Sequence, residues 1–365
     1  MIGREEERAV LGEALAGARD GRTQIVSLIG PAGIGKTRLI HDFVDRHQGS
    51  SAEAVLVFRG SPRDTATSYG LFTRLLRARF GLVEGMAPDD ARQQIRTQAS
   101  RVLEDRKVGD VIYFLGQLLD LPFSESPLTK AVRDDPHQAE LLRRAVFKSF
   151  LEADAQSAPM VLVFDDLQQA HEDSLSLLRY LLEYLNGKVL VICAARADLL
   201  VRYEDWDRVG EDRHRLIDLV ALDDDDASTV MRALLAPSQD PVEPLVEAAV
   251  SFAGGNPAML EQMVRIFHDA GVLREERAGA AHHAVWRVDL PRLAGAKLPL
   301  TIEDAVTARI AALDPEERRL LENASIMGSV FWRGGFLAMA RAEGEGPEYW
   351  NPEADDDGAR IDALL

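Results

Sequence analysis

The chain has 365 residues, of which 46% are hydrophobic and 28% charged, proportions typical of a globular protein with two or three domains. The 60 Asp and Glu residues outnumber the 42 Lys and Arg residues, and the resulting formal net charge of −18 disfavours a nucleic-acid-binding surface. One cysteine, Cys193, cannot form an internal disulfide, and no apolar run reaches the ~18–20 residues of a membrane helix. We therefore expect a cytoplasmic protein without a membrane span.

Short β-branched or apolar segments in the first 222 residues predict strands. They lie at 24–29, 54–58, 160–164, 188–194 and, more weakly, 216–220. The third and fourth segments are continuously apolar, as in strands that are covered on both faces of a parallel sheet. Because helical patterns separate the strands, we expect a doubly wound α/β domain with a parallel sheet of about five strands at 1–222.

The rest of the chain is predicted to be mainly helical. A long insertion at 62–157, between the second and third strands, has helical stretches at 91–104, 110–119 and 138–155. Further helices are expected at 224–235, 241–253, 257–270 and 301–313, with a small hairpin that pairs 272–274 with 284–288. We divide this part into a helical lid at 223–298, the start of a winged-helix-like domain at 299–342 and an acidic flexible tail at 343–365.

A glycine-rich loop follows the first strand. Its sequence is Gly30-Pro31-Ala32-Gly33-Ile34-Gly35-Lys36-Thr37, and a helix at 38–45, beginning with Arg38, comes next. This matches the G-x-x-x-x-G-K-[ST] phosphate-binding loop at every fixed position and in the expected strand–loop–helix context. Backbone N–H groups of such a loop bind phosphates, Lys36 would contact the β- and γ-phosphates, and Thr37 would ligate Mg²⁺. We therefore predict that the chain binds ATP or ADP with Mg²⁺.

Two acids end the third strand. Asp165 and Asp166 follow Val161-Leu162-Val163-Phe164, and the carboxyl ends of parallel strands meet at the edge of the sheet where ligands bind. Acids at this place can also simply begin a loop and cap the next helix. Together with the phosphate loop, the pattern favours Asp165 as the Mg²⁺ residue beside Thr37 and Asp166 as the residue that activates the attacking water.

The motifs in their order resemble those of STAND-type P-loop ATPases, which are signal-transduction ATPases with numerous domains in the AAA+ group. The segment Asp165-Asp166-Leu167-Gln168-Gln169-Ala170 is similar to their Asp-Asp-Leu-His-Trp-Ala motif, Ile2-Gly3-Arg4-Glu5 to their entry motif, and Gly254-Gly255-Asn256-Pro257 to their Gly-Asn-Pro motif. The resemblance implies that Gly3, Arg4 and Pro257 lie against the adenine and that Arg196, after the fourth strand, senses the γ-phosphate. Helix capping explains 254–257, and a solvated side chain explains Arg196, without any nucleotide.

The sequence departs from the family pattern at two places. Gln168 and Gln169 replace the usual His and Trp, so the contacts that this Trp makes in the family are not expected here. The second acid is Asp where many AAA+ motors have the longer Glu, a change expected to slow hydrolysis. No arginine finger is identifiable; Arg143 and Arg144 are only candidates. The sequence therefore predicts slow hydrolysis of ATP to ADP and phosphate.

Three classes of function share such a core. We favour a nucleotide-dependent switch whose partners are ATP and other domains of a larger regulatory protein or separate proteins, with nucleotide-dependent self-association as a further expectation. The alternatives are an AAA+ nucleic-acid loader or initiator ATPase, which the negative charge disfavours, and a small-molecule kinase, which usually lacks a long lid. No Asn-Lys-x-Asp motif is present, so ATP is favoured over GTP. Because the last residues resemble an unfinished helix, we expect a fragment of a longer protein.

Overall fold

The computed structural model describes residues 1–48, 55–62, 66–132, 134–277 and 284–293, together with seven single positions between 307 and 325. The chain divides into two compact units. The first, which we call the core unit, consists of Met1–Ala233 and Ala253–Leu260. The second, which we call the helical unit, consists of Leu234–Phe252 and Glu261–Leu365.

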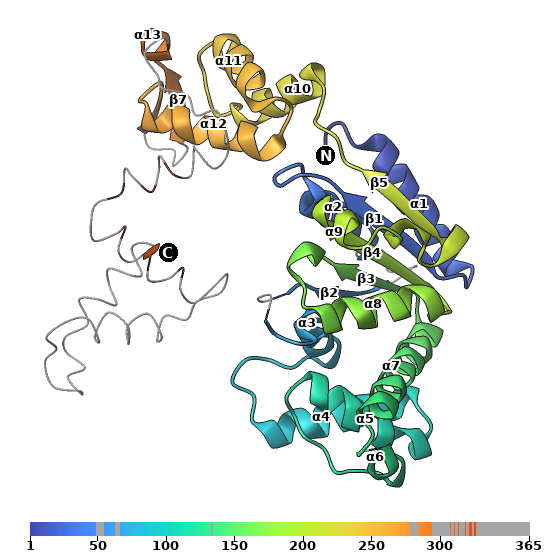
Figure 1. The fold of residues 1–365 in the computed structure, drawn as a ribbon. Helices are drawn as coiled ribbons and strands as arrows, with labels where there is room; N and C mark the ends of the chain where they lie inside the picture. The colour runs from blue at the N-terminus through green and yellow to red at the C-terminus, as the bar shows by residue number, and fades with distance from the viewer. Residues whose placement is uncertain are drawn as a thin grey trace, which may run out of the picture. The chain divides into compact units, whose positions relative to one another are not determined.

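A five-stranded parallel sheet forms the centre of the core unit (Figure 1). Its strands, in spatial order, are β2 (Leu56–Gly60), β3 (Met160–Phe164), β4 (Val189–Ala195), β1 (Gln24–Ile29) and β5 (His214–Asp218). The predicted α/β class and the parallel sheet of five strands are confirmed. Since β4 lies between β1 and β3, the segments that leave these three strands at their carboxyl ends are neighbours.

The predicted strand limits agree best for two of the three inner strands, β1 and β3. The structure has β1 and β3 at the predicted residues, whereas β4 lies one residue later, β2 two residues later and β5 two residues earlier than predicted. Pairing with the neighbour sets the outer limits: Leu56 is opposite Met160 in β3, and His214 is opposite Ile25 in β1. The apolar pattern of an edge strand does not contain this register.

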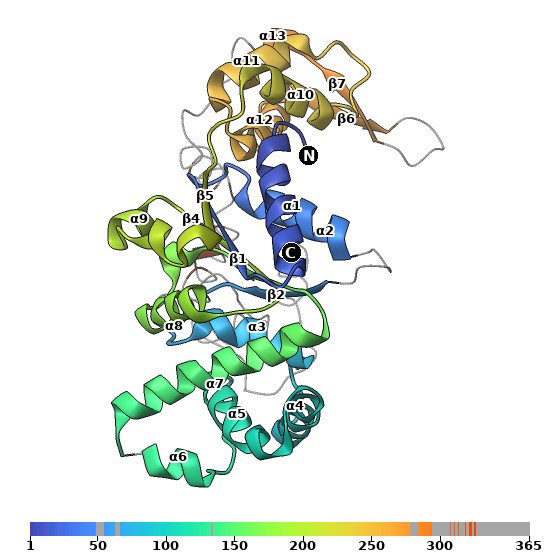
Figure 2. The same ribbon diagram turned by 90° about the vertical axis from the view of Figure 1, so that its right-hand side faces the viewer.

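Helices cover both faces of the sheet (Figure 2). Alternate residues of β1 point to opposite faces, with Val26 and Leu28 in one apolar cluster and Ile25 and Ile29 in the other. The first cluster includes side chains of α1 (Glu5–Arg19) and α2 (Lys36–Gln48), and the second includes α3 (Gly70–Phe80), α7 (Pro136–Ser157) and α8 (Glu172–Tyr184). Two covered faces explain why the central strands are continuously apolar.

The segment between β2 and β3 is helical, as predicted, but contains more helices than the sequence pattern indicates. It consists of α3, α4 (Pro88–Val102), α5 (Asp105–Leu118), α6 (Pro127–Val132) and α7. The predicted stretches correspond to α4, α5 and α7, while α3 and α6 are additional. A buried ion pair joins the ends of this segment: Arg79 donates to both carboxylate oxygens of Asp154, which is 1% exposed. Such a two-bond contact holds α3 against α7.

After β4 the chain forms the short helix α9 (Asp198–Arg202), and after β5 it enters α10 (Asp224–Leu234). The later described elements are α11 (Glu243–Ala253), α12 (Pro257–Asp269), the antiparallel pair β6 (Leu273–Arg277) and β7 (Ala284–Val288), and α13 (Leu290–Leu293). These match the predicted helices and hairpin. The expected helix at 301–313, the winged-helix-like segment at 299–342 and the tail at 343–365 lie outside the residues described as continuous chain.

In the helical unit, polar contacts tie the hairpin to the segment before α11. Asp240 accepts from the backbone N–H of Val288 at 2.9 Å and pairs with Arg287 at 3.2 Å, and these contacts lower the pKa of its carboxyl. The ring of Trp286 packs edge-on against His268 of α12, with centroids 4.6 Å apart. Across the described ranges, no helix has the length and apolar character needed to cross a membrane.

Candidate functional site

The predicted phosphate loop connects β1 to α2, and α2 begins at Lys36. Gly33 and Gly35 have φ angles of +78° and +102°, a region of backbone space that glycine enters without strain. Pro31, Ala32 and Gly33 are exposed, whereas Ile34 is buried in the cluster beneath α2. The loop therefore presents residues 31–33 to solvent, while Ile34 anchors it in the core.

Lys36 lies folded back on the loop. Its Nζ donates to the carbonyl oxygens of Gly30 at 2.7 Å and Pro31 at 2.9 Å, and the residue is only 8% exposed. Burial lowers the pKa of this amine, and so does Arg196, while Asp165 and Asp166 act in the opposite direction. Among the described residues, no carboxylate lies within ion-pair distance of it. A desolvated cation held by carbonyls alone fits a polyanionic ligand.

Thr37 and Asp165 meet, as the sequence predicted. The Thr37 hydroxyl donates to Oδ2 of Asp165 at 2.8 Å, and the backbone N–H of Asp166 donates to Oδ1 at 2.9 Å. Burial raises the pKa of the Asp165 carboxyl, with a further contribution from Asp166. A hydroxyl and a carboxylate are the hard oxygen ligands that Mg²⁺ takes when it keeps waters and phosphate oxygens as its other ligands. The pair fits such an ion, and within the described ranges no cluster of three or more His, Cys, Asp or Glu offers another metal site.

Gln168 connects the predicted site residues Asp166 and Arg196, although the sequence did not predict Gln168 itself as a site residue. Asp166 has a left-handed backbone, with φ of 54°, and its Oδ1 accepts from Nε2 of Gln168 at 3.1 Å. Oε1 of the same amide accepts from the backbone N–H of Arg196 at 3.2 Å. The second acid at the end of β3 is thereby linked to the end of β4. In the sequence, Gln168 is visible only as a replacement for the His of the family motif, and this replacement does not indicate which residues its amide contacts.

Arg4 is directed at backbone oxygens. It is 3% exposed, and its guanidinium donates to the carbonyls of Val220 at 2.7 Å and Ile34 at 3.3 Å and pairs with Glu7 at 3.0 Å. Gly3, with φ of +65°, lies so close to α10 that an added Cβ would be 2.2 Å from a carboxylate oxygen of Asp226. The entry motif is thus in contact with the phosphate loop and with the segment that leads to α10. The adenine contact that the family resemblance implies stays a prediction.

The Gly-Asn-Pro segment also contacts the phosphate loop. Nδ2 of Asn256 donates to the carbonyl of Ala32 at 3.0 Å, and the backbone N–H of Ala258 donates to that of Gly33 at 3.2 Å. The half-buried Pro257, which is the predicted site residue, stands between them as the first residue of α12. Helix capping explains Asn256 in part, because its Oδ1 accepts from Ala258 N at 3.1 Å. The contact of Asn256 with Ala32 could not be predicted from the spacing of residues in the sequence.

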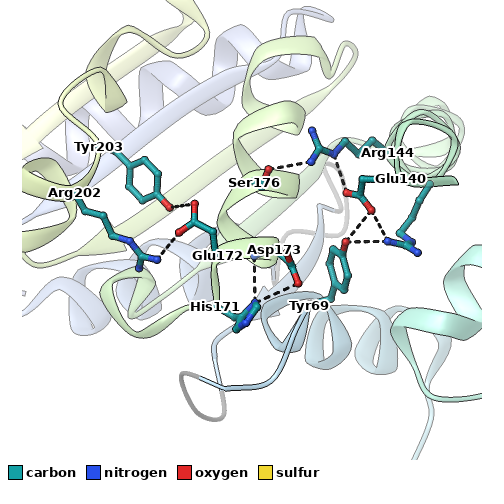
Figure 3. A network of polar contacts seen from close by, with 10 residues as sticks. Tyr69, Glu140, Arg144, His171, Glu172, Asp173, Ser176, Arg202 and Tyr203 are labelled. Atoms are coloured by element: carbon teal, nitrogen blue, oxygen red, sulfur yellow. Dashed lines mark hydrogen bonds and ion pairs between the residues drawn. The ribbon is translucent and has the colours of Figure 1, made fainter. Parts of the chain in front are cut away.

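The remaining candidates are arginines. Arg38 is exposed on the first turn of α2. Arg143 and Arg144, the candidate arginine fingers, both pair with Glu140, which Figure 3 shows between Tyr69 and Arg144. Arg143 also donates to the Tyr69 hydroxyl at 2.9 Å. Arg144 donates to the hydroxyl of Ser176 at 3.0 Å, as Figure 3 shows. Both guanidinium groups are therefore engaged within this chain.

The fold and these contacts describe a P-loop nucleotide-binding domain, and a comparison with protein families agrees. Residues 1–192, more than half of the chain, match the family described as the AAA ATPase domain. The chain belongs to this family. An uncharacterized protein of Rhizobium meliloti (strain 1021) is 27% identical over 267 residues, which are 72% of this chain and 24% of that protein. The chain thus spans about a quarter of the length of this relative.

Two solved structures show similarity in fold. One is a STAND protein with a tetratricopeptide repeat sensor from Pyrococcus horikoshii, with a TM-score of 0.43 and 14% identity over 89% of this chain and 35% of that chain. The other is the Orc1 protein of Aeropyrum pernix in complex with DNA, with a TM-score of 0.44 and 15% identity over 100% of this chain and 84% of that chain.

Proposed function

We propose that this chain binds ATP with Mg²⁺ at residues 30–37 and works as a slowly hydrolysing, nucleotide-dependent switch module of a cytoplasmic STAND-type signalling or regulatory protein. The observation that carries the proposal is the Lys36 amine, which is buried on two loop carbonyls without a carboxylate partner among the described residues. It stands beside the Thr37–Asp165 pair, so a cationic group and a hard-oxygen pair face the same loop. The ordered motifs of the family support the STAND assignment.

Each site residue has a task that its contacts support. A bound Mg²⁺ would neutralise phosphate charge, with Thr37 and Asp165 as its protein ligands. Lys36 would exchange its carbonyl contacts for the β- and γ-phosphates. Asp166 is exposed and ends β3, where its carboxylate can accept a proton from the attacking water while Gln168 holds Oδ1.

We expect slow ATP hydrolysis because of two features of the site. The second acid is an Asp, and Arg143 and Arg144 are engaged by Glu140, so within the described chain neither is free to stabilise the transition state. A missing arginine finger typically costs ~10³–10⁵ in rate. We expect the isolated chain to hydrolyse ATP well below the ~10 s⁻¹ that is a typical enzyme median. Such a protein would act through the difference between its ATP and ADP states.

A nucleic-acid loader remains the alternative class. The net charge of −18 leads us to prefer the switch, since loaders need basic residues on the face that meets phosphates. Titration with duplex DNA at low and moderate salt separates the two. Binding that weakens steeply with salt would support the loader, and an absence of binding would support the switch.

The test of nucleotide binding compares two lysines. Lys36→Ala removes the point charge from the loop, and we expect ATP affinity in Mg²⁺ to fall by at least roughly a hundredfold by calorimetry. Lys188→Ala removes an equal charge from an exposed residue before β4 and should leave ATP affinity within about twofold. Equal affinities of the Lys36 variant and the wild-type chain would refute the proposal.

A further inference from the structure

We infer that Arg4 and Asn256 are positioning residues of the phosphate loop: they hold its carbonyl side and so set the affinity for a polyphosphate, whatever base it carries. This inference rests on the proposed function, because it assigns these residues to the same nucleotide site. It assigns them a task other than a contact with adenine. The contacts that carry it come from segments far from the loop in sequence.

Every carbonyl from residue 30 to residue 35 accepts a hydrogen bond. The donors are Lys36 for Gly30 and Pro31, Asn256 for Ala32, Ala258 N for Gly33, Arg4 for Ile34 and Leu39 N for Gly35. A trans peptide unit points its C=O and its N–H in opposite directions. Donors that hold the carbonyls therefore fix the direction of the N–H groups with which such loops bind phosphate.

Arg4 makes its part of this arrangement from a buried position. One nitrogen, Nη2, bridges Ile34 O in the loop and Val220 O in the segment after β5, and Nε of the same side chain is buried with no hydrogen-bond partner among the described residues. Burying a guanidinium is costly unless its contacts are good, and Glu7 is its ion-pair partner. The group is 3% exposed, so its accessible chemistry is directed at backbone rather than at a ligand in solvent.

Asn256 uses both ends of its amide. The carbonyl of Ala32 can only accept and the N–H of Ala258 can only donate, so these partners fix the amide orientation with Nδ2 toward the loop. An Asp at this position would still accept from Ala258 and cap α12, but it could not donate to Ala32. Asn256→Asp therefore removes the loop contact and keeps the helix cap.

A contact with adenine and a positioning role in the phosphate loop predict losses of affinity for different ligands. A residue that touches adenine contributes to ATP binding and contributes nothing to binding of inorganic tripolyphosphate. A residue that holds the loop contributes equally to both and to GTP. Selectivity among ATP, GTP and tripolyphosphate, each with Mg²⁺, is therefore a direct readout of the role.

The experiment measures these three affinities for Arg4→Met, Arg4→Lys and Asn256→Asp. The controls are Arg22→Met and Asn186→Asp, which make matched changes at exposed residues. We expect Arg4→Met and Asn256→Asp to bind all three ligands roughly tenfold more weakly, with Lys restoring part of the loss at residue 4. The controls should stay within about twofold. A loss confined to ATP, or no loss, would overturn the inference.

A second readout needs no nucleotide. Hydrogen exchange of the ligand-free protein should be faster in residues 30–37 of Arg4→Met and Asn256→Asp, with 189–195 in the buried strand unchanged as the measure of an intact fold. If the wild-type chain binds none of the ligands, the proposed function is wrong and the affinity part of the inference fails with it, whereas faster loop exchange in the variants would support only the part that concerns the conformation of the loop. Unchanged loop exchange in both variants would overturn it.

Discussion

The sheet of the core unit carries two polar clusters that differ in how completely they are paired. At the carboxyl ends of β1 and β3, burial lowers the pKa of Lys36 and raises the pKa of Asp165. Inside the sheet, Ser27 of β1, His214 of β5 and Trp206 form a chain of hydrogen bonds in which Ser27 and Trp206 are fully buried. The first cluster carries charges, and the second is neutral.

The chemistry of its partners fixes the protons of the inner cluster. The carbonyl of Val209 can only accept, so Nδ1 of His214 donates to it at 2.9 Å. Nε2 then accepts from the Ser27 hydroxyl at 2.8 Å, and Ser27 Oγ accepts from Trp206 Nε1 at 2.9 Å. Each donor has an acceptor, and burial lowers the pKa of His214, which keeps the ring neutral.

From this contrast we expect the first cluster to serve the proposed function and the second to stabilise the fold. Desolvated charges with shifted pKa values gather at functional sites because a ligand completes their interactions. A satisfied neutral network has nothing further to bind, and it can only hold the strands together. Changes in the first cluster should therefore alter ligand chemistry with little effect on folding, and changes in the second should do the reverse.

The largest expected effect concerns the charged cluster at the ends of β1 and β3, where Asp166 adjoins Asp165. Asp166→Asn removes the carboxylate that would accept a proton from water, and we expect ATP turnover to fall roughly 10²- to 10⁴-fold. ATP affinity and the free energy of unfolding should stay close to those of the wild-type chain. Steady-state phosphate release, calorimetry and urea unfolding measure the three quantities.

The matched control for this change is Asp212→Asn. Asp212 is exposed and, in the part of the chain that the structure describes, pairs across the surface with Arg22 at 3.2 Å, so its loss should leave turnover unchanged. An Asp166→Asn variant with full turnover, or one that is markedly destabilised, would erase the distinction between the two clusters.

The next effect concerns the inner cluster. Ser27→Ala leaves the Trp206 N–H and Nε2 of His214 buried without their partner, and we expect the free energy of unfolding to fall by about 2–4 kcal/mol. Urea unfolding measures it, with Ser100→Ala on the exposed side of α4 as a control that changes stability by less than about 0.5 kcal/mol. ATP affinity of the folded Ser27→Ala protein should be unchanged; weaker binding would link the inner cluster to function.

The smallest effect is a dependence on pH. The unfolded chain protonates His214 near pH ~6.5, whereas the folded chain does so only at lower pH, since burial lowers the pKa. The contribution of His214 to stability is therefore complete above pH ~6.5. It decreases as the pH falls toward the folded pKa, by up to about 1.4 kcal/mol for each pH unit that separates the two pKa values.

His214→Gln provides the comparison, since glutamine offers a donor and an acceptor but does not titrate. We expect the stability difference between wild type and variant to shrink as the pH falls below ~6.5. Urea unfolding at a series of pH values measures it. A constant difference from pH 8 to pH 5 would show that the ring is not held neutral.

The sequence predicts those features of the fold and the site that depend on residues close together along the chain. The limits of β1 and β3, the phosphate loop and the proximity of Thr37 to Asp165 follow from apolar runs, fixed motif spacing and the meeting of strand ends. The limits of β2 and β5 did not follow, because their partners set the register.

The contacts that sequence reasoning missed join distant segments. Gln168 bonds to the backbone of Arg196, and Asn256 bonds to Ala32 across 224 positions. Local capping rules explained Asn256 without its second partner. The pairing of Glu140 with Arg143 and Arg144 is a different case, because these residues are three and four positions apart on one helix, a spacing that permits an ion pair.

The core unit is assembled from two stretches of sequence. Residues 253–260 return to it after the chain has formed part of the helical unit, and α12 belongs to the core unit through Leu260 and to the helical unit from Glu261. A recombination joint after residue 222 would move the phosphate loop to a new protein without the donors that hold Ala32 and Gly33. A recombination that keeps these contacts of the loop would therefore have to move residues 253–260 together with residues 1–233.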